Sequence, residues 1–136
     1  MGTRFTTSYE NSDWHADYLR ALLDAQEGDD VAFDGVYGPC RGLRNEASER
    51  LLGSTHGGEG GEVVDPVELI RWKIESMQRA QTDGDVTNGL VLIGQVASGI
   101  RELISVAEFV PEMAIEAARI LRRLAATVEV EPEVAR

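Results

Sequence analysis

The chain offers few of the side chains that usually carry metal or nucleophilic chemistry. It contains a single cysteine, Cys40, and two histidines, His15 and His56, that lie far apart in the sequence. One cysteine permits neither an internal disulfide nor a thiolate metal cluster, and the histidines lack the spacing of metal ligands. We therefore predict no metal site and interpret Cys40 as a small buried side chain.

A glycine-rich stretch is the next candidate, because glycine lets a backbone approach a phosphate closely. Residues 53–61 (GSTHGGEGG) hold five glycines in nine positions. The stretch lacks the Gly-Lys-Ser/Thr ending of a phosphate-binding P-loop. A flexible surface connection is therefore the better interpretation.

Gln95 and three aromatic residues are candidates for lining a cavity. Gln95 follows a short apolar run, 89–94 (GLVLIG), which predicts a buried extended segment. Its amide either faces a ligand cavity or caps a backbone group, and the sequence leaves both options open. Trp14, Tyr18 and Trp72 fall into helical patterns, which favour core positions over a substrate cavity.

The elements that must position these residues are mainly helices with short extended segments. The first residues, 1–9, are typical of a strand end running into a loop. The remaining predicted elements are four helices and one strand. The first helix is capped by Asn11, Ser12 or Asp13 and ends near Gly28, and the strand follows over 30–37. The other three helices run over 41–52, from Asp65-Pro66 to Asp83-Gly84, and over 105–124.

Apolar spacing assigns a buried face to the two longest helices. In the helix after Asp65 the predicted buried stripe is Val67, Ile70, Ile74 and Met77. In the last helix Ser105 and Glu108 have the spacing of a capping box, and Pro111 is expected to kink the helix or delay its start. Its apolar stripe is Val106, Phe109, Val110, Met113, Ala117, Leu121 and Leu124.

Composition excludes two classes of partner. The net charge is −11, with 24 acidic and 13 basic residues, so the chain lacks the basic footprint of a nucleic-acid-binding protein. The longest apolar run, 90–93, is far too short to cross a bilayer, and the first residues do not resemble a signal peptide. We therefore expect no membrane partner and a cytoplasmic location.

Four segments in chain order resemble the nitronate monooxygenase (2-nitropropane dioxygenase) family of FMN-dependent TIM-barrel oxidoreductases. They cover nearly the whole chain. The matching segments are MGTRF at 1–5, the helix with Tyr18 and Ala21-Leu22-Leu23 followed by Asp29-Asp30-Val31, RGLRN at 41–45, and GQVA at 94–97 leading through SVAE at 105–108.

The resemblance implies that the chain is a C-terminal fragment of an FMN-binding (β/α)8 barrel. Residues 1–7 would be the end of strand eight with a phosphate-binding turn, 8–88 a helical cap that forms the substrate domain, and 89–136 a return segment and a terminal helix packed on the barrel. A complete barrel needs roughly 200 residues or more. A missing barrel segment or an oligomeric partner is therefore expected to be required.

Site residues follow from the same resemblance. Gly2 and Thr3 match the positions that bind the FMN phosphate, and Gln95 is a candidate contact with the flavin. Arg41 and Arg44, with the neighbouring Asn45, are expected to fix the cap through carboxylate or carbonyl contacts. The family's catalytic histidine lies in the barrel section that precedes the match, so no catalytic residue is assigned in this chain.

The implied activity is oxidation of alkyl nitronates with oxygen, with NAD(P)H as the reductant in some relatives. We expect the isolated chain to be inactive. The enzymatic alternatives are an NAD(P)H-dependent flavin reductase or an enoyl-thioester reductase of the same architecture. The alternative from another class is a stand-alone acidic helical interaction module that docks on a separate barrel partner.

Overall fold

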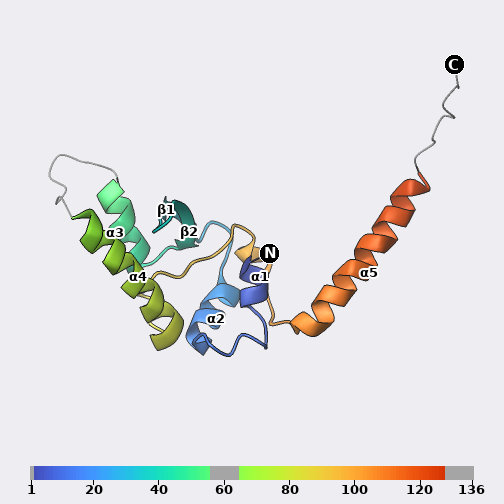
Figure 1. The fold of residues 1–136 in the computed structure, drawn as a ribbon, viewed down its shortest axis with the longest axis horizontal. Coiled ribbons are helices and arrows are strands. Elements are labelled where there is room, and N and C mark those ends of the chain that lie inside the picture. The colour runs from blue at the N-terminus through green and yellow to red at the C-terminus, as the bar shows by residue number, and fades with distance from the viewer. Residues whose placement is uncertain (1, 56–64, 128–136) are drawn as a thin grey trace, which may run out of the picture.

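The computed structural model describes residues 2–55 and 65–127, which form a mostly helical chain with one two-stranded sheet. Helices α2, α3 and α4 gather around the hairpin, α1 lies beside them, and α5 stands apart from that group (Figure 1). In chain order the elements are α1 (Gly2–Thr6), α2 (Ala16–Asp24), β1 (Asp30–Asp34), β2 (Pro39–Leu43), α3 (Glu46–Thr55), α4 (Pro66–Asp83), the 3-10 turn η1 (Ala97–Gly99) and α5 (Val106–Ala125).

The extended segment 89–94 joins two apolar clusters. Leu90 belongs to a cluster with β1 and α3, whereas Val91 and Ile93 belong to a cluster with α2. The segment lies along β2, because Leu43 N donates to Val91 O at 2.9 Å and Ile93 N donates to Arg41 O at 3.0 Å. The predicted burial of this segment is confirmed.

The N-terminal segment differs from its prediction. The sequence predicts a strand end over 1–9, whereas the chain forms helix α1 there. A strand needs a neighbour for its N–H and C=O groups, while a helical turn satisfies them within the segment. Thr6 Oγ1 reinforces the turn by donating to Gly2 O at 3.2 Å. Extended pairing begins at Ser8, which forms a parallel bridge with Ile104.

Helix α2 keeps its predicted face but has a different cap. The predicted caps Asn11, Ser12 and Asp13 are wrong, because the N-cap is His15, whose ring Nδ1 accepts a hydrogen bond from Asp17 N at 3.2 Å. The predicted core position of Tyr18 is confirmed, and Leu22 and Ala25, which follow it at helical spacing, are buried as well.

The hairpin corrects the predicted helix over 41–52. Residues 39–43 form β2, which pairs antiparallel with β1 so that Asp30 faces Leu43, and α3 starts only at Glu46. The reason is packing at Gly42, where an added Cβ would lie 2.8 Å from the Val91 carbonyl oxygen. Only a glycine lets the strand approach the segment 89–94 so closely.

Helix α4 begins and ends as predicted but turns a different face inward. Asp65 accepts a hydrogen bond from Val67 N, Pro66 occupies the first turn, and Gly84 ends the helix with φ 74°. The predicted buried stripe is wrong at three of its four positions, since Val67, Ile70 and Ile74 are exposed, and only Met77 packs against the core. The buried residues of the helix are Lys73, Ser76 and Ala80. The polar pair faces inward because Lys73 Nζ donates to Gly35 O at 3.1 Å and Ser76 Oγ accepts from Leu90 N at 3.1 Å.

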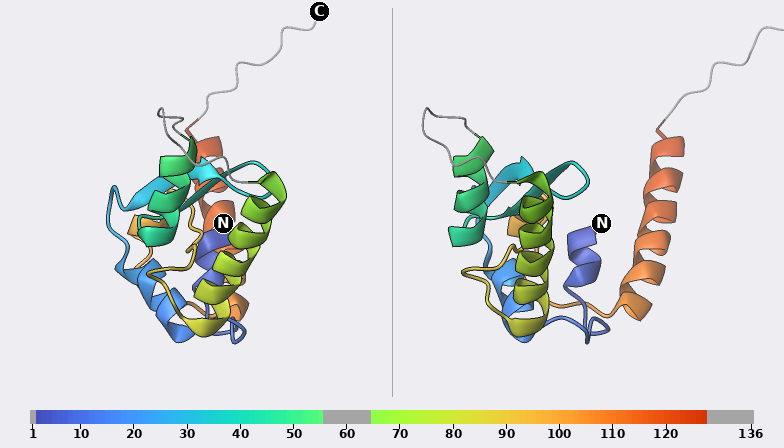
Figure 2. Two further views of the ribbon diagram at one scale, coloured as in Figure 1. Left: turned by 90° about the vertical axis from the view of Figure 1, so that its left-hand side faces the viewer. Right: turned by 60° about the vertical axis from the view of Figure 1, so that its left-hand side comes forward.

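Helix α5 spans its predicted range, and Pro111 does not delay its start. The predicted capping box is wrong, because the Ser105 hydroxyl donates instead to Glu10 Oε1 at 2.9 Å. Glu10 also accepts from Ala107 N at 3.4 Å, so a carboxylate distant in sequence caps the helix. The helix runs past α1 without joining the α2–α4 group, as the right-hand view of Figure 2 shows.

Candidate functional site

The predicted cofactor-binding residues lie in two segments that are far apart in the sequence, and one hydrogen bond brings these segments together. Gly94 N donates to Thr3 Oγ1 at 2.6 Å. An added Cβ on Gly94 would lie 3.0 Å from the same oxygen, so glycine permits the short contact. Gly2 is exposed and Gln95 is exposed beside Gly94. The three predicted residues therefore flank one junction between α1 and the segment after residue 93.

Further contacts hold this junction in place. Tyr9 N donates to Ile104 O at 2.9 Å, and Ile104 N donates to Thr7 O at 3.2 Å. Arg4 Nη1 donates to Glu102 O at 2.7 Å. Three sets of hydrogen bonds thus hold the N-terminal segment against residues 94–104. Together they fix the position of Thr3.

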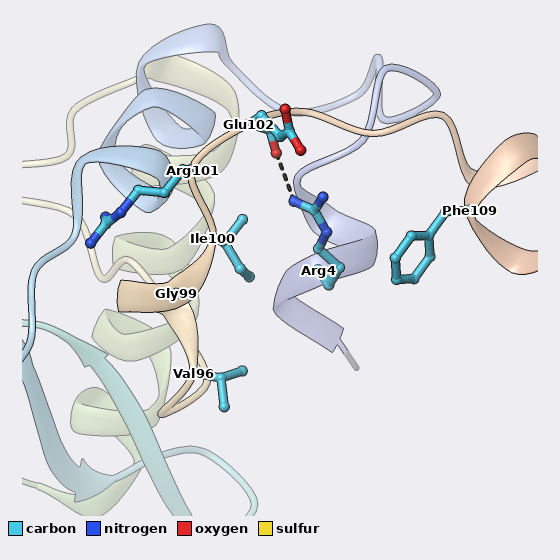
Figure 3. A pocket seen from close by; sticks show the side chains of 7 residues that line it. All are labelled: Arg4, Val96, Gly99, Ile100, Arg101, Glu102 and Phe109. Atoms are coloured by element: carbon cyan, nitrogen blue, oxygen red, sulfur yellow. Dashed lines mark hydrogen bonds between the residues drawn. The ribbon is translucent and has the colours of Figure 1, made fainter. Parts of the chain in front are cut away.

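A cavity of about 440 Å³ opens next to this junction (Figure 3). Its apolar walls come from Val96, Ile100 and Phe109. Arg4 lies over the Phe109 ring, with its guanidinium carbon 5.6 Å from the ring centroid. The complete lining is Arg4, Val96, Gly99, Ile100, Arg101, Glu102 and Phe109.

The side chains of the two arginines in the cavity lining point in different directions. Arg101 points away from the cavity, toward α2, and donates to Ala25 O at 2.8 Å (Figure 3). Arg4 stays between α1 and α5, where its bond to Glu102 O uses one of five guanidinium donors. The cavity therefore combines apolar walls with one cation, Arg4, and one acidic residue, Glu102, in its lining.

The aromatic residues considered from sequence are structural. The hydroxyl of Tyr18 donates to Leu92 O at 3.0 Å and accepts from Leu92 N at 2.9 Å. Burial raises the pKa of Tyr18 to about 12, so the phenol stays neutral at ordinary pH. Trp14 packs edge-on against Tyr18 at 4.8 Å, and Trp72 lies under Arg50 at 4.6 Å between α3 and α4. None of these three rings lines the cavity described above.

Arg41, Arg44 and Asn45 make the expected carboxylate and carbonyl contacts, and the partners of both arginines lie within residues 8–88. Arg41 pairs with Asp30 across the hairpin, and Arg44 pairs with Glu49 at the start of α3. Asn45 donates from Nδ2 to the carbonyl oxygens of Val86 and Gly89, both at 2.8 Å. The Asn45 contacts tie the segment between the hairpin and α3 to the loop after α4.

The remaining candidates carry no site in the described residues. Cys40 is half-buried beside Gly35, and His15 serves as the cap of α2, while His56 lies outside the described ranges. Among residues 2–55 and 65–127, no cluster of His, Cys, Asp and Glu side chains is arranged to hold a metal ion. Within the same ranges, no helix has the length and apolar character needed to cross a membrane.

The sequence did not predict two features of the structure. Lys73, the only lysine, is buried, and its ammonium group binds the hairpin turn. Arg4 and Phe109 meet at the cavity although they are far apart in the sequence. The Phe109 position on a predicted apolar stripe was the one signal available for this contact, and nothing local indicated its partner.

Comparison with known proteins finds relatives at the level of structure. No family model matches the chain, and neither does any curated protein. The structure of FabK from Thermotoga maritima is similar, with a TM-score of 0.73 and 25% identity over 94% of this chain and 39% of that chain. A single-residue variant of the same protein gives a TM-score of 0.67, 25% identity and coverage of 94% and 36%. The chain thus spans about two fifths of the length of these structures, which is consistent with part of a TIM barrel.

Proposed function

We propose that this chain is a portion of a flavin-dependent oxidoreductase. The observation that carries the proposal is its similarity to FabK, a flavin-dependent oxidoreductase, over 94% of the chain. The junction of Thr3 with Gly94 supports it independently, because it joins the segments that the family resemblance assigns to the cofactor. The division into a phosphate-binding turn (1–7), a cap (8–88) and a return segment (89–136) is part of the same proposal.

The donor set at this junction fits a phosphate group, and FMN is the flavin we propose. The first N–H groups of a helix have no partner within it, and in α1 these belong to Gly2 and the residues after it. The Thr3 hydroxyl accepts from Gly94 and keeps its own proton available to donate. Nothing lies within 4 Å of a Cβ added to Gly2, so an incoming phosphate meets open space there.

The chain's own residues bind and shield the cofactor in this proposal. Gly2 and Thr3 would hold the phosphate, and Gln95 would contact the ring system. The apolar residues Val96 and Ile100 would exclude water from the adjoining cavity. The flavin, when bound, supplies the electron transfer. Neither Tyr18 nor His15 is proposed as a proton-transfer group, because the Tyr18 hydroxyl donates to Leu92 O and His15 is engaged as a helix cap.

The reaction we propose is oxidation of alkyl nitronates with oxygen, as the family resemblance implies. Reduction of an enoyl thioester, or of the flavin alone, by NAD(P)H is the enzymatic alternative. The full-length protein distinguishes them: flavin reduction by a nitronate without NAD(P)H supports the first reaction. Reduction of the flavin by NAD(P)H alone, followed by reoxidation of the flavin by an enoyl thioester, would support the second reaction instead.

Comparing FMN with riboflavin tests the phosphate site directly. We expect the full-length protein to bind FMN more tightly than riboflavin, and Thr3→Val to remove most of that preference. Thr82→Val is the matched control, since the Thr82 hydroxyl bonds only within the end of α4 and to Asp83. Equal affinity for the two flavins, or a preference that survives Thr3→Val, would reject the site.

A second candidate is an acidic interaction module, possible for this chain because α5 leaves an apolar face uncovered. No residue of α5, all of which lie in the described range, is buried. Contiguous exposed apolar surface of this kind marks a contact with another molecule. A folded chain without affinity for any flavin would favour this candidate over the oxidoreductase.

A further inference from the structure

The turn of the hairpin, residues 35–38, carries a fully exposed tyrosine, Tyr37. The turn that holds it is tightly built. Gly35 N donates to Gly38 O at 2.8 Å, and an added Cβ on Gly35 would clash with Cys40 Sγ. A tyrosine ring has only two rotatable side-chain bonds, so on a fixed turn it offers a large contact surface at a low cost in conformational entropy.

A buried lysine fixes this turn to α4. Lys73 is 7% exposed, and its Nζ donates to Gly35 O at 3.1 Å. Within residues 2–55 and 65–127 the Lys73 ammonium forms no ion pair. Lysine is rarely buried without such a pair, because removing an ammonium from water is costly. An apolar side chain would fill the same place without that cost, so we infer that Lys73 contributes its hydrogen bond to the turn.

The fixed turn extends toward α1, whose first residues form the proposed phosphate site. Figure 1 places the hairpin between α4 and α1, and the right-hand view of Figure 2 shows the turn reaching past α4 on the side of α1. An added Cβ on Gly2 has nothing within 4 Å, so the start of α1 is open to a ligand. Tyr37 therefore projects from the cap on the side where the proposed cofactor binds.

We propose that Tyr37 contacts the ring system of the bound flavin and that Lys73 is the positioning residue that holds the turn in place for this contact. The inference rests on the proposed function, since it takes the flavin phosphate to lie at Gly2 and Thr3. The flavin ring system is flat and aromatic, and aromatic rings attract one another in offset or edge-on arrangements. The contact involves the ring system alone, so riboflavin makes it as well as FMN.

The flavin affinity of the full-length protein tests the contact. We expect Tyr37→Ala to weaken the binding of FMN and of riboflavin on the order of tenfold, and to shift the visible absorption band of the bound flavin. Tyr37→Phe keeps the ring and should bind both flavins as the wild type does. Tyr9→Ala is the matched control: Tyr9 is 70% exposed, and its hydrogen bond to Ile104 comes from the backbone, so both affinities should be unchanged.

A double-mutant cycle tests the part played by Lys73. Lys73→Met keeps a long, flexible side chain at the buried position and removes the hydrogen bond to the turn. We expect it to weaken the binding of both flavins, and the double variant with Tyr37→Ala to bind no more weakly than Tyr37→Ala alone, because Lys73 acts through Tyr37. Fully additive losses would overturn the positioning role.

The remaining outcomes separate this inference from the proposed function. FMN binding that depends on Thr3 but is unchanged in Tyr37→Ala would overturn the inference alone. A Tyr37→Ala protein with unchanged flavin affinity and a raised KM for the substrate would also overturn it, because the ring would then contact the substrate. A wild-type protein that binds neither flavin would overturn the inference and the proposed function together.

Discussion

Replacing Tyr18 by phenylalanine removes two hydrogen bonds that tie α2 to the buried segment 89–94. Tyr18 is 0% exposed, and its hydroxyl contacts both backbone groups of Leu92, at 3.0 and 2.9 Å. The variant keeps the ring but leaves the Leu92 N–H and C=O without that partner. Since each unsatisfied group costs about 1–3 kcal/mol, we expect the free energy of unfolding to fall by about 2–4 kcal/mol.

Urea denaturation followed by circular dichroism measures this loss. With a slope of about 2 kcal/mol per molar urea, a loss of about 2–4 kcal/mol lowers the midpoint by about 1–2 M. Tyr37→Phe is the control, because Tyr37 is fully exposed at the hairpin turn and should not change the midpoint. A Tyr18→Phe midpoint equal to that of the Tyr37 variant would refute the assigned role of the Leu92 contacts.

The same residue predicts a dependence of stability on alkaline pH. Burial raises the pKa of Tyr18 from 10.0 to about 12. The unfolded chain therefore loses this proton above pH 10 while the folded chain retains it, so stability is full below pH 10 and falls as the pH rises toward 12. The Tyr18→Phe variant should lack this part of the decline, and Tyr37→Phe should keep it.

Three further predictions follow from local contacts. Gly42→Ala should destabilise the fold by about 1–3 kcal/mol, because the new Cβ meets the Val91 carbonyl at 2.8 Å. Gly53→Ala, in open space within α3, should instead stabilise the fold by about 0.5–1 kcal/mol. Equal effects of the two substitutions in thermal melts would contradict the contact at Gly42. Asn45→Ala loses two carbonyl contacts and should cost about 2 kcal/mol in urea melts. Hydrogen bonds from the first turn of α5 lower the pKa of Glu10. The protection of amides in that turn, relative to their intrinsic hydrogen exchange, should therefore fall as the pH falls through the Glu10 pKa, and Glu10→Gln should abolish this dependence.

Local signals predicted the ends of α4 better than its buried face. Asp65-Pro66 and Gly84 define α4 because capping depends on neighbouring residues alone. The face of α4 depends on distant backbone groups, since Lys73 and Ser76 turn inward to satisfy Gly35 and the segment 89–94. Periodicity favours the apolar residues for the inside and carries no information about such acceptors.

Long-range pairing accounts for the other differences. The strand β2 forms because Gly42 lets it pack against both β1 and the segment 89–94. Its sequence alone is equally compatible with a helix. The junction of Thr3 with Gly94 joins residues that no local pattern relates. Family resemblance, rather than spacing, selected Gly2, Thr3 and Gln95, and their cofactor role stays a prediction.

A titration with FMN of this chain together with the barrel segment that the family resemblance implies, followed by flavin fluorescence, tests the central proposal most directly. The account predicts saturable one-to-one binding that free phosphate weakens by competing at Gly2 and Thr3. Fluorescence that remains that of free FMN at every chain concentration, or binding that phosphate does not affect, would contradict it.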